Sequence, residues 1–387
     1  MSTLGSAALG QLVGIAGEIT EAVVAPNAEA EDAEARWPEP AMRALADAGL
    51  MGLNVPEEFG GHGQGLSGLV AVTDVLAQES PSTALCFAMH CVGAAVIAAK
   101  ATQYHQEHYL VPIARGEHIT TLALSEPGTG SHFYIPQTRL TRAEDEFVVE
   151  GTKSFITNGG HADSYVMSTV AETDGGSEGA FSCVLVDADA PGLVWQAEWR
   201  GLGMRSNSSR TVRLERSRIP TANLLGEKGD QLWYVFEVIA PYFLMAMAGT
   251  YSGIARAAVE IAREHLGTRR HGHSGELIGA NPVVAHRLGD IWAEMEKTRH
   301  LVRSAGQLAD AGDPEALISV LACKAAAGDA AVGAANEAMT LIGGIGYREN
   351  SKLARMLRDA RASHVMAPTT DMLKTWVGRA LLNQPLI

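Results

Sequence analysis

The sequence lacks the cysteine patterns of disulfide-rich and zinc-binding proteins. It has four cysteines in 387 residues, with no Cys-x-x-Cys pair and no spacing typical of a zinc site. In a chain of this length such cysteines are expected to be buried thiols in a reducing compartment, which predicts a cytoplasmic protein without a metal site. The four are Cys86, Cys91, Cys183 and Cys323.

Dense positive charge and long apolar runs are also missing. The formal net charge is −14 and no block of lysine and arginine offsets it, which argues against a nucleic-acid partner. Residues 1–12 do not show a basic segment followed by an apolar core, so no secretory signal is expected. Residues 84–99 fall short of the roughly 20 that a membrane span needs, and Pro241 and Ser252 interrupt 238–255. Both segments are expected to be buried helices.

The composition that remains is that of a globular protein with two or three domains. Hydrophobic residues make up 47% and charged residues 19%, enough to bury a sizeable core. Helical spacing dominates residues 1–117 and 229–387, whereas 118–228 holds β-prone runs separated by glycine and aspartate turns. The sequence therefore predicts a mostly α protein with a β insert: an N-terminal helical domain, a middle small β-barrel or sandwich, and a C-terminal helical bundle.

The predicted elements follow these three regions. Expected helices are 10–24, 41–49, 66–77, 82–100, 104–116, 231–266, 282–311, 314–342 and a final pair around 351–382. Expected strands are the run before residue 124, then 147–157, 165–170, 181–186 and 211–219.

The stretch Leu124–Ser131 follows the first of these strands. Glycines at 128 and 130 let the backbone turn through positive φ or approach a flat ligand closely. Hydroxyls at Ser125, Thr129 and Ser131 add short hydrogen-bonding arms. Such a loop suits a phosphate or the polar edge of a ring, and taken alone it equally suits an ordinary turn.

Four groups of motifs, taken in their order along the chain, resemble the acyl-CoA dehydrogenase family of flavoproteins. Val55–Gly61, near the N-terminus, fits the same family. The four groups are Leu124–Ser131; Gly151–Gly159; Gly201–Ser206 with Arg218–Pro220 and Asn223–Gly226; and Gly343–Tyr347 with Arg358–Arg361. The resemblance covers nearly the whole chain. It implies FAD between the β domain and a C-terminal four-helix bundle, in a homodimer or homotetramer.

The resemblance also implies a role for individual residues. Leu124, Ser125 and Ser131 would line the flavin and its phosphates. Phe155 would be the aromatic wall beside the flavin, and Thr157 the hydroxyl near its N5. Arg269 or Arg270 would reach the pyrophosphate of a neighbouring subunit's FAD, where a guanidinium matches phosphate geometry. The remaining contacts would be Gly343 and Gly344 at the adenine half and Thr369 near the catalytic edge.

The catalytic base of the family does not occur at either of its usual positions. The family's reaction removes the α-proton of an acyl thioester while hydride leaves the β-carbon, which needs a base, most often a glutamate. Ala367, followed by Pro368, occupies the position of that glutamate. The alternative position, on the helix that opens the bundle, falls at Phe243, and the adjacent arginine falls at Leu244. His90, His364 and Asp371 are candidates for a relocated base by neighbourhood only.

Three interpretations follow from this pattern. The first is a flavin dehydrogenase or oxidase acting on an acyl thioester, bound to CoA or to a carrier protein, with an electron-transfer or carrier protein as a further partner. The second is a flavin monooxygenase, which needs no carboxylate base; the segments 361–368 and 377–382 resemble the tail of such enzymes. The third is a non-catalytic flavoprotein subunit. We rank them in that order.

Overall fold

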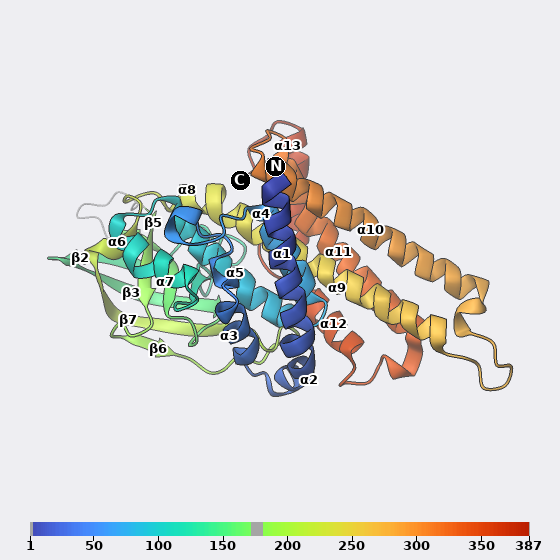
Figure 1. Cartoon of the computed structure of the whole chain (residues 1–387). Helices are drawn as coiled ribbons and strands as arrows, with labels where there is room; N and C mark the ends of the chain where they lie inside the picture. The colour runs from blue at the N-terminus through green and yellow to red at the C-terminus, as the bar shows by residue number, and fades with distance from the viewer. Residues whose placement is uncertain (1–2, 172–180, 387) are drawn as a thin grey trace.

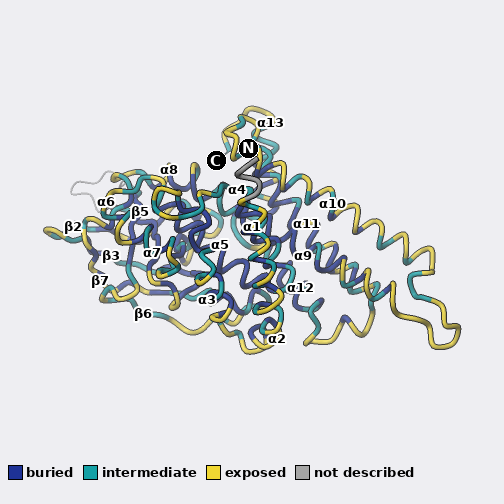
Figure 2. The backbone as a smooth tube through the Cα atoms, in the orientation of Figure 1, coloured by how far each residue is buried: buried dark blue, intermediate teal, exposed yellow. Residues whose placement is uncertain are grey.

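A computed structural model, which describes residues 3–171 and 181–386, has a β-sheet at one end and long C-terminal helices at the other (Figure 1). The N-terminal helices pack across the junction between them. Buried residues concentrate at this junction and inside the sheet, whereas the far ends of the long helices are largely exposed (Figure 2). The predicted order of helices, β insert and helices is confirmed. All four cysteines are free and buried.

The N-terminal part is helical, as predicted. One predicted helix, 66–77, matches the structure residue for residue. The helix that follows begins where Ser80 caps it: the Ser80 hydroxyl accepts a hydrogen bond from the Thr83 N–H at 3.2 Å. The helices are α1 (Thr3–Ile19), α2 (Ala25–Glu34), α3 (Glu39–Asp47), α4 (Leu66–Ala77), α5 (Pro81–Ala99), α6 (Gln103–His105) and α7 (Val111–Ala114), with 3₁₀ turns at Leu50–Gly52 and Glu57–Phe59.

Three helical stretches contain a π-helical segment that ends just before a proline. The pairs are Thr20–Val24 with Pro26, Gln106–Leu110 with Pro112, and Tyr234–Ile239 with Pro241. A proline ring clashes with the carbonyl four residues earlier and has no N–H to donate. A wider turn moves that carbonyl away, so the helix continues. For this reason the predicted end of a helix at residue 24 is wrong, and the helix runs on through α2.

Four helical segments of the described chain are long and apolar enough to cross a membrane: Ala8–Glu34, Pro81–Ala99, Gln231–Thr268 and Ala316–Ile345. The expectation that residues 84–99 are too short is therefore wrong, because α5 has 19 residues. The burial of α5 agrees with the expectation that residues 84–99 form a buried helix. Within the apolar window of α5, 89% of the residues are buried inside the protein, which is typical of a core helix.

The β insert forms one eight-stranded sheet with the order β6-β7-β3-β2-β4-β5-β8, and β1 pairs with β4. Its strands are β1 (Thr120–Ala123), β2 (Arg139–Ala143), β3 (Glu146–Ile156), β4 (Ser164–Ala171), β5 (Phe181–Asp187), β6 (Leu193–Trp195), β7 (Arg210–Pro220) and β8 (Leu224–Leu225). The long strands agree with the predicted ones. β2, β6 and β8 were not predicted, because they are short and carry little of the alternating apolar pattern that marks a strand.

Two strands share one edge of β4, and this places the first predicted motif. β1 pairs in parallel with residues 164–167, and β2 pairs in parallel with residues 170–171. The chain between β1 and β2 leaves the sheet at this point. The connection 124–138, which begins with the Leu124–Ser131 loop, is therefore held at both ends by neighbouring positions of β4.

The C-terminal part is a bundle of long helices. Along the bundle α9, α10 and α11 lie side by side (Figure 1), and α13 packs on α11. Its helices are α8 (Gln231–Trp233), α9 (Ala240–Thr268), α10 (Pro282–Asp310), α11 (Ala316–Ile342), α12 (Lys352–Ala360) and α13 (Thr370–Leu381). Small residues allow close approach, as predicted for alanine- and glycine-rich 322–335: a Cβ on Gly328 would lie 2.8 Å from the Cβ of Ser363.

One carboxyl group in α2 is buried away from water. Glu31 is 1% exposed, and neither of its carboxylate oxygens has a hydrogen-bond partner among the described residues. Burial raises the pKa of Glu31 to about 7, and Arg36 and Arg355 oppose this only in part. The folded protein therefore holds the proton more tightly than the unfolded chain, so stability falls as the pH rises from about 4.5 to about 7.

Replacing Glu31 by methionine is expected to stabilise the protein in a pH-dependent way. At pH 8 the free energy of unfolding should rise by about 1–3 kcal/mol, the usual cost of an unsatisfied buried polar group. The gain should shrink toward pH 5, where the folded wild-type carboxyl is protonated. Urea unfolding at both pH values measures this. Glu31→Gln should abolish the same pH dependence, and an equal gain at both pH values would contradict the assignment.

Candidate functional site

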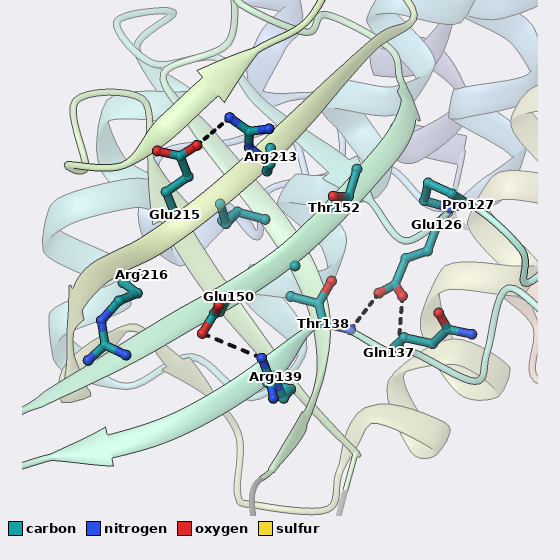
Figure 3. Close-up of a pocket in the computed structure, with 12 residues that line it drawn as sticks. Glu126, Pro127, Gln137, Thr138, Arg139, Glu150, Thr152, Arg213, Glu215 and Arg216 are labelled. Carbon is teal, nitrogen blue, oxygen red and sulfur yellow. Dashed lines mark hydrogen bonds and ion pairs between the residues drawn. The ribbon is translucent and has the colours of Figure 1, made fainter.

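The loop Leu124–Ser131 is closed by a buried glutamate that the sequence interpretation left without a role. Glu126 Oε2 accepts a hydrogen bond from the Gln137 N–H at 2.7 Å, and Oε1 accepts one from the Thr138 N–H at 3.1 Å. Figure 3 shows the carboxylate pointing at these two backbone groups. The contacts tie the start of the loop to the segment that leads into β2. The loop is therefore held in shape from inside.

A buried lysine on β3 pairs with this glutamate. Lys153 Nζ lies 2.5 Å from Glu126 Oε1 and donates to the Ser168 carbonyl at 2.6 Å, and the Lys153 side chain is fully buried. Burial lowers the pKa of Lys153, and the Glu126 charge opposes that shift. The ammonium also contacts the Leu124 carbonyl at 3.4 Å. The signal in the sequence was a lysine inside an otherwise β-prone strand.

Next to Lys153 the strand bulges and turns Phe155 outward. The register of β3 against β7 shifts between Lys153 and Ile156, and Phe155 has a φ of +55°. Phe155 is 66% exposed and meets Trp199 edge-on with ring centroids 6.2 Å apart. Bulges and positive φ values at non-glycine residues concentrate at functional sites. An exposed aromatic ring in this conformation offers a stacking surface.

The structure brings the first two predicted motifs into contact. The Ser154 N–H donates to the Ser125 carbonyl at 2.8 Å, which places Phe155 beside the loop. The Ser154 hydroxyl is buried and has no hydrogen-bond partner among the described residues. Ser125 and Ser131 are half-buried, and Leu124 is 7% exposed. A Cβ on Gly128 or Gly130 would meet open space, so the loop presents its backbone freely.

Thr157 and the following asparagine fix the end of β3 against the helical domain. Thr157 is 5% exposed, and its carbonyl accepts a hydrogen bond from the Thr121 hydroxyl at 2.9 Å. Asn158 Nδ2 donates to the Cys86 carbonyl on α5, and Asn158 Oδ1 accepts from Trp37 Nε1, both at 2.9 Å. Asn158 was part of a predicted motif but was given no role. These two contacts anchor the end of β3 to α5 and to Trp37.

The two positions predicted for the family's base carry apolar side chains that pack against the core. Phe243 lies in the first turn of α9 and Ala367 lies before α13, and both are half-buried. Thr369 caps α13, accepting a hydrogen bond from the Met372 N–H at 3.4 Å. Ala367 lies two residues before this cap.

Two of the three candidate bases, His90 and His364, have hydrogen-bond partners for their side chains in the structure. His90 is fully buried: Nε2 lies 2.9 Å from the Met51 carbonyl, and Nδ1 accepts from the Thr120 N–H at 3.2 Å. Burial lowers the pKa of His90 to about 4, so it is neutral. His364 contacts Asp329 Oδ1 at 3.0 Å and also Arg361. Asp371 is exposed in the first turn of α13, where a negative charge favours the helix. The contacts of His90 and His364, and the position of Asp371 at a helix start, indicate structural roles for all three.

The remaining predicted residues lie at the far end of the bundle. Arg269 follows α9, and Arg270 Nη1 donates to the Gly275 carbonyl at 2.9 Å. Gly343 follows α11 with a φ of +72°, next to Gly344. This end, where α9 meets α10, is remote from the sheet (Figure 1). One chain does not bring these residues to Phe155, and their predicted role toward a neighbouring subunit stays a prediction.

A groove of about 720 Å³ lies on the outer face of the sheet (Figure 3). Paired charges line it, among them Arg139 with Glu150 and Arg213 with Glu215. None of the ten residues predicted to contact the cofactor lines this groove. It therefore differs from the predicted flavin site.

Comparisons with known proteins support the family that the motifs resemble. Models of the acyl-CoA dehydrogenase N-terminal, middle and C-terminal domains match residues 11–117, 121–217 and 243–382. A cyclohex-1-ene-1-carbonyl-CoA dehydrogenase of Geobacter metallireducens is 30% identical over 361 residues, 93% of this chain and 94% of that protein. Two solved structures share the fold. Butyryl-CoA dehydrogenase from Megasphaera elsdenii has a TM-score of 0.91 and 24% identity, covering 97% of this chain and 98% of that one. The prolyl acyl carrier protein oxidase AnaB has a TM-score of 0.87 and 22% identity, covering 98% and 99%. The chain belongs to the acyl-CoA dehydrogenase family.

Proposed function

We propose that this protein is an FAD-dependent oxidoreductase that oxidises an acyl thioester at its α,β carbon–carbon bond and uses a base at a non-standard position. The observation that carries the proposal is Phe155, a two-thirds exposed ring held at positive φ beside the Leu124–Ser131 loop. Membership of the family supports FAD as the cofactor. The Ser154 hydroxyl, which has no partner in the described part of the chain, and the open Gly128 and Gly130 fit a flat polar ligand at this place.

The residues of the chain would divide the work by position. Phe155 would stack on the flavin, and Ser125, Ser131 and Thr157 would hydrogen-bond to it from the sheet side. Thr369 would approach from the bundle. FAD, when bound, supplies the acceptor for the hydride that leaves the β-carbon. The chain supplies placement, exclusion of water and an acceptor for the α-proton.

That proton acceptor is neither residue 243 nor residue 367. Both are hydrocarbon side chains in the structure. A missing general base typically lowers a rate by about 10²–10⁴-fold. We therefore infer a substrate whose α-proton is more acidic than that of a simple saturated acyl-CoA, or an acceptor from another position.

The experiment is anaerobic bleaching of the yellow protein by a panel of acyl thioesters. Both CoA and carrier-protein thioesters belong in the panel, because one protein of the same fold is a prolyl acyl carrier protein oxidase. Loss of flavin absorbance with at least one thioester is expected. A purified protein that never retains FAD, or whose flavin no thioester bleaches, would overturn the proposal.

We also propose a homodimer or homotetramer in the cytoplasm, with an electron-transfer or carrier protein as a further partner. Val283 and Trp292 on α10 are 66% and 53% exposed. Exposed aromatic side chains such as Trp292 are typical of interfaces between protein chains, and most soluble oligomers consist of copies of one chain. Sedimentation measurements would show the number of subunits.

Replacing Arg269 and Arg270 together by alanine is expected to lower FAD occupancy. Hydrogen bonds between a guanidinium and a phosphate are charge-assisted, so affinity should fall by roughly 10–100-fold. The ratio of flavin to protein absorbance measures this. Arg263→Ala is the control, because Arg263 lies on α9 shortly before the two arginines and pairs with Glu260 at the surface. Unchanged occupancy in the double variant would remove the predicted phosphate role.

A further inference from the structure

Lys324 is a buried cation on α11 whose partners are all backbone carbonyls. Its Nζ lies 2.7 Å from the Pro368 carbonyl and 3.1 Å from the carbonyls of Ser363 and Met366. The side chain is fully buried, and Lys324 forms no ion pair within the described residues. Three acceptors require three N–H donors, which only the ammonium form has. Burial lowers the pKa of Lys324 to about 7, and the three carbonyls favour the charged form.

The three carbonyls belong to one segment, Ser363–Thr370, which links α12 to α13. Further contacts hold the segment against the bundle: the Thr370 hydroxyl donates to the Ser363 carbonyl at 3.3 Å, and the Tyr251 hydroxyl contacts Met366 Sδ at 3.5 Å. Lys324 comes from another helix and contacts carbonyls on both sides of residue 367. The ammonium therefore sets the path of the segment.

A buried charge without a carboxylate partner is costly, so its presence calls for a reason. Moving an ammonium group out of water costs free energy, and only well-placed hydrogen bonds to the charged group offset that cost. A methionine would fill the same space without that penalty, but it would remove the ammonium from the buried Met366 and Pro368 carbonyls and leave the Ser363 carbonyl with the Thr370 hydroxyl. The segment that these carbonyls shape includes Ala367, at the usual position of the family's base, and Thr369, the predicted flavin contact.

We propose that Lys324 is a positioning residue: it holds Ser363–Thr370 in the path that sets Thr369 and residue 367 against the flavin. The role toward flavin rests on the proposed function. The role toward the segment does not, because the contacts exist in the protein alone. Lys324 does not remove the substrate's proton, since each N–H already has a carbonyl partner.

The test is hydrogen exchange of the segment in Lys324→Met, measured by mass spectrometry with and without added FAD. The Val365 and Met366 amides donate to the Ala362 carbonyl, so their exchange reports on the path of the segment. In the variant their exchange should be faster by roughly tenfold, a local opening with the rest of the bundle intact. Lys374→Met is the matched control: Lys374 lies on α13 and reaches Asp329 of α11 at 2.8 Å, but its side chain is 57% exposed.

A chemical rescue separates charge from packing. In Lys324→Ala, propylammonium should restore slow exchange and the wild-type absorbance and fluorescence of bound FAD, whereas propan-1-ol should not. Equal rescue by the alcohol, or unchanged exchange in Lys324→Met, would overturn the proposal. If Lys324→Met does not fold, Lys324→Gln replaces it, and exchange as slow as in the wild type would again overturn it. A wild-type protein that never binds FAD would refute the proposed function, while the exchange result would still decide the role of Lys324 toward the segment.

Discussion

Replacing Lys153 by methionine is expected to lower the free energy of unfolding by about 3–5 kcal/mol, the usual cost of removing one partner of a buried ion pair. The variant leaves the Glu126 carboxylate charged and buried, and it removes the donor to the Ser168 carbonyl. Because Glu126 closes the Leu124–Ser131 loop, FAD occupancy should fall as well. Urea unfolding followed by circular dichroism measures the stability.

Two further variants show whether the cost comes from the buried charge. Arg213→Met breaks an ion pair with Glu215 at the surface of the same sheet, and it should cost less than about 1 kcal/mol. Adding Glu126→Gln to Lys153→Met removes the unpaired charge and should recover part of the loss. If Lys153→Met were no more destabilising than Arg213→Met, the buried Lys153–Glu126 pair would contribute no more to the free energy of unfolding than a surface pair.

Introducing glutamate at Ala367 is expected to raise the rate at which a simple saturated acyl-CoA bleaches the flavin, by about 10²–10⁴-fold. The substitution places a carboxylate at the position predicted for the family's base, on the segment that Lys324 contacts and that leads into the Thr369 cap. Stopped-flow absorbance under anaerobic conditions measures the rate.

Two controls isolate the carboxylate and its position. Ala367→Gln has nearly the same size without a basic oxygen and should bring no gain. Val365→Glu adds a carboxylate two residues earlier at a side chain that is 64% exposed, and it should also bring none. A gain with Ala367→Gln, or no gain with Ala367→Glu at unchanged FAD occupancy, would show that residue 367 does not lie over the substrate.

The arrangement of elements was predictable because the local pattern and the tertiary fold agree. Helix α4 was predicted at its observed bounds, since its apolar spacing is helical and glycine and polar residues flank it. The family was predictable because Leu124–Ser131 and Gly151–Gly159 occur in the same order as in the family. Ordinary turns would not be expected to match several of its motifs in that order. The short strand β2 was missed, because only Leu140 of its five residues is buried and no periodicity stands out.

Sequence alone thus determined the family, the order of helices and sheet, and the apolar character of residues 243 and 367, since these depend on local pattern and residue type. Only the tertiary structure decided which polar groups meet: Lys153 with Glu126, and Lys324 with the carbonyls of Ser363–Thr370. It also showed that the backbone occupies both ring nitrogens of His90. The physical reason is burial. Whether a charged or titratable side chain is desolvated, and what satisfies it, depends on segments far apart in the chain, which no local pattern encodes.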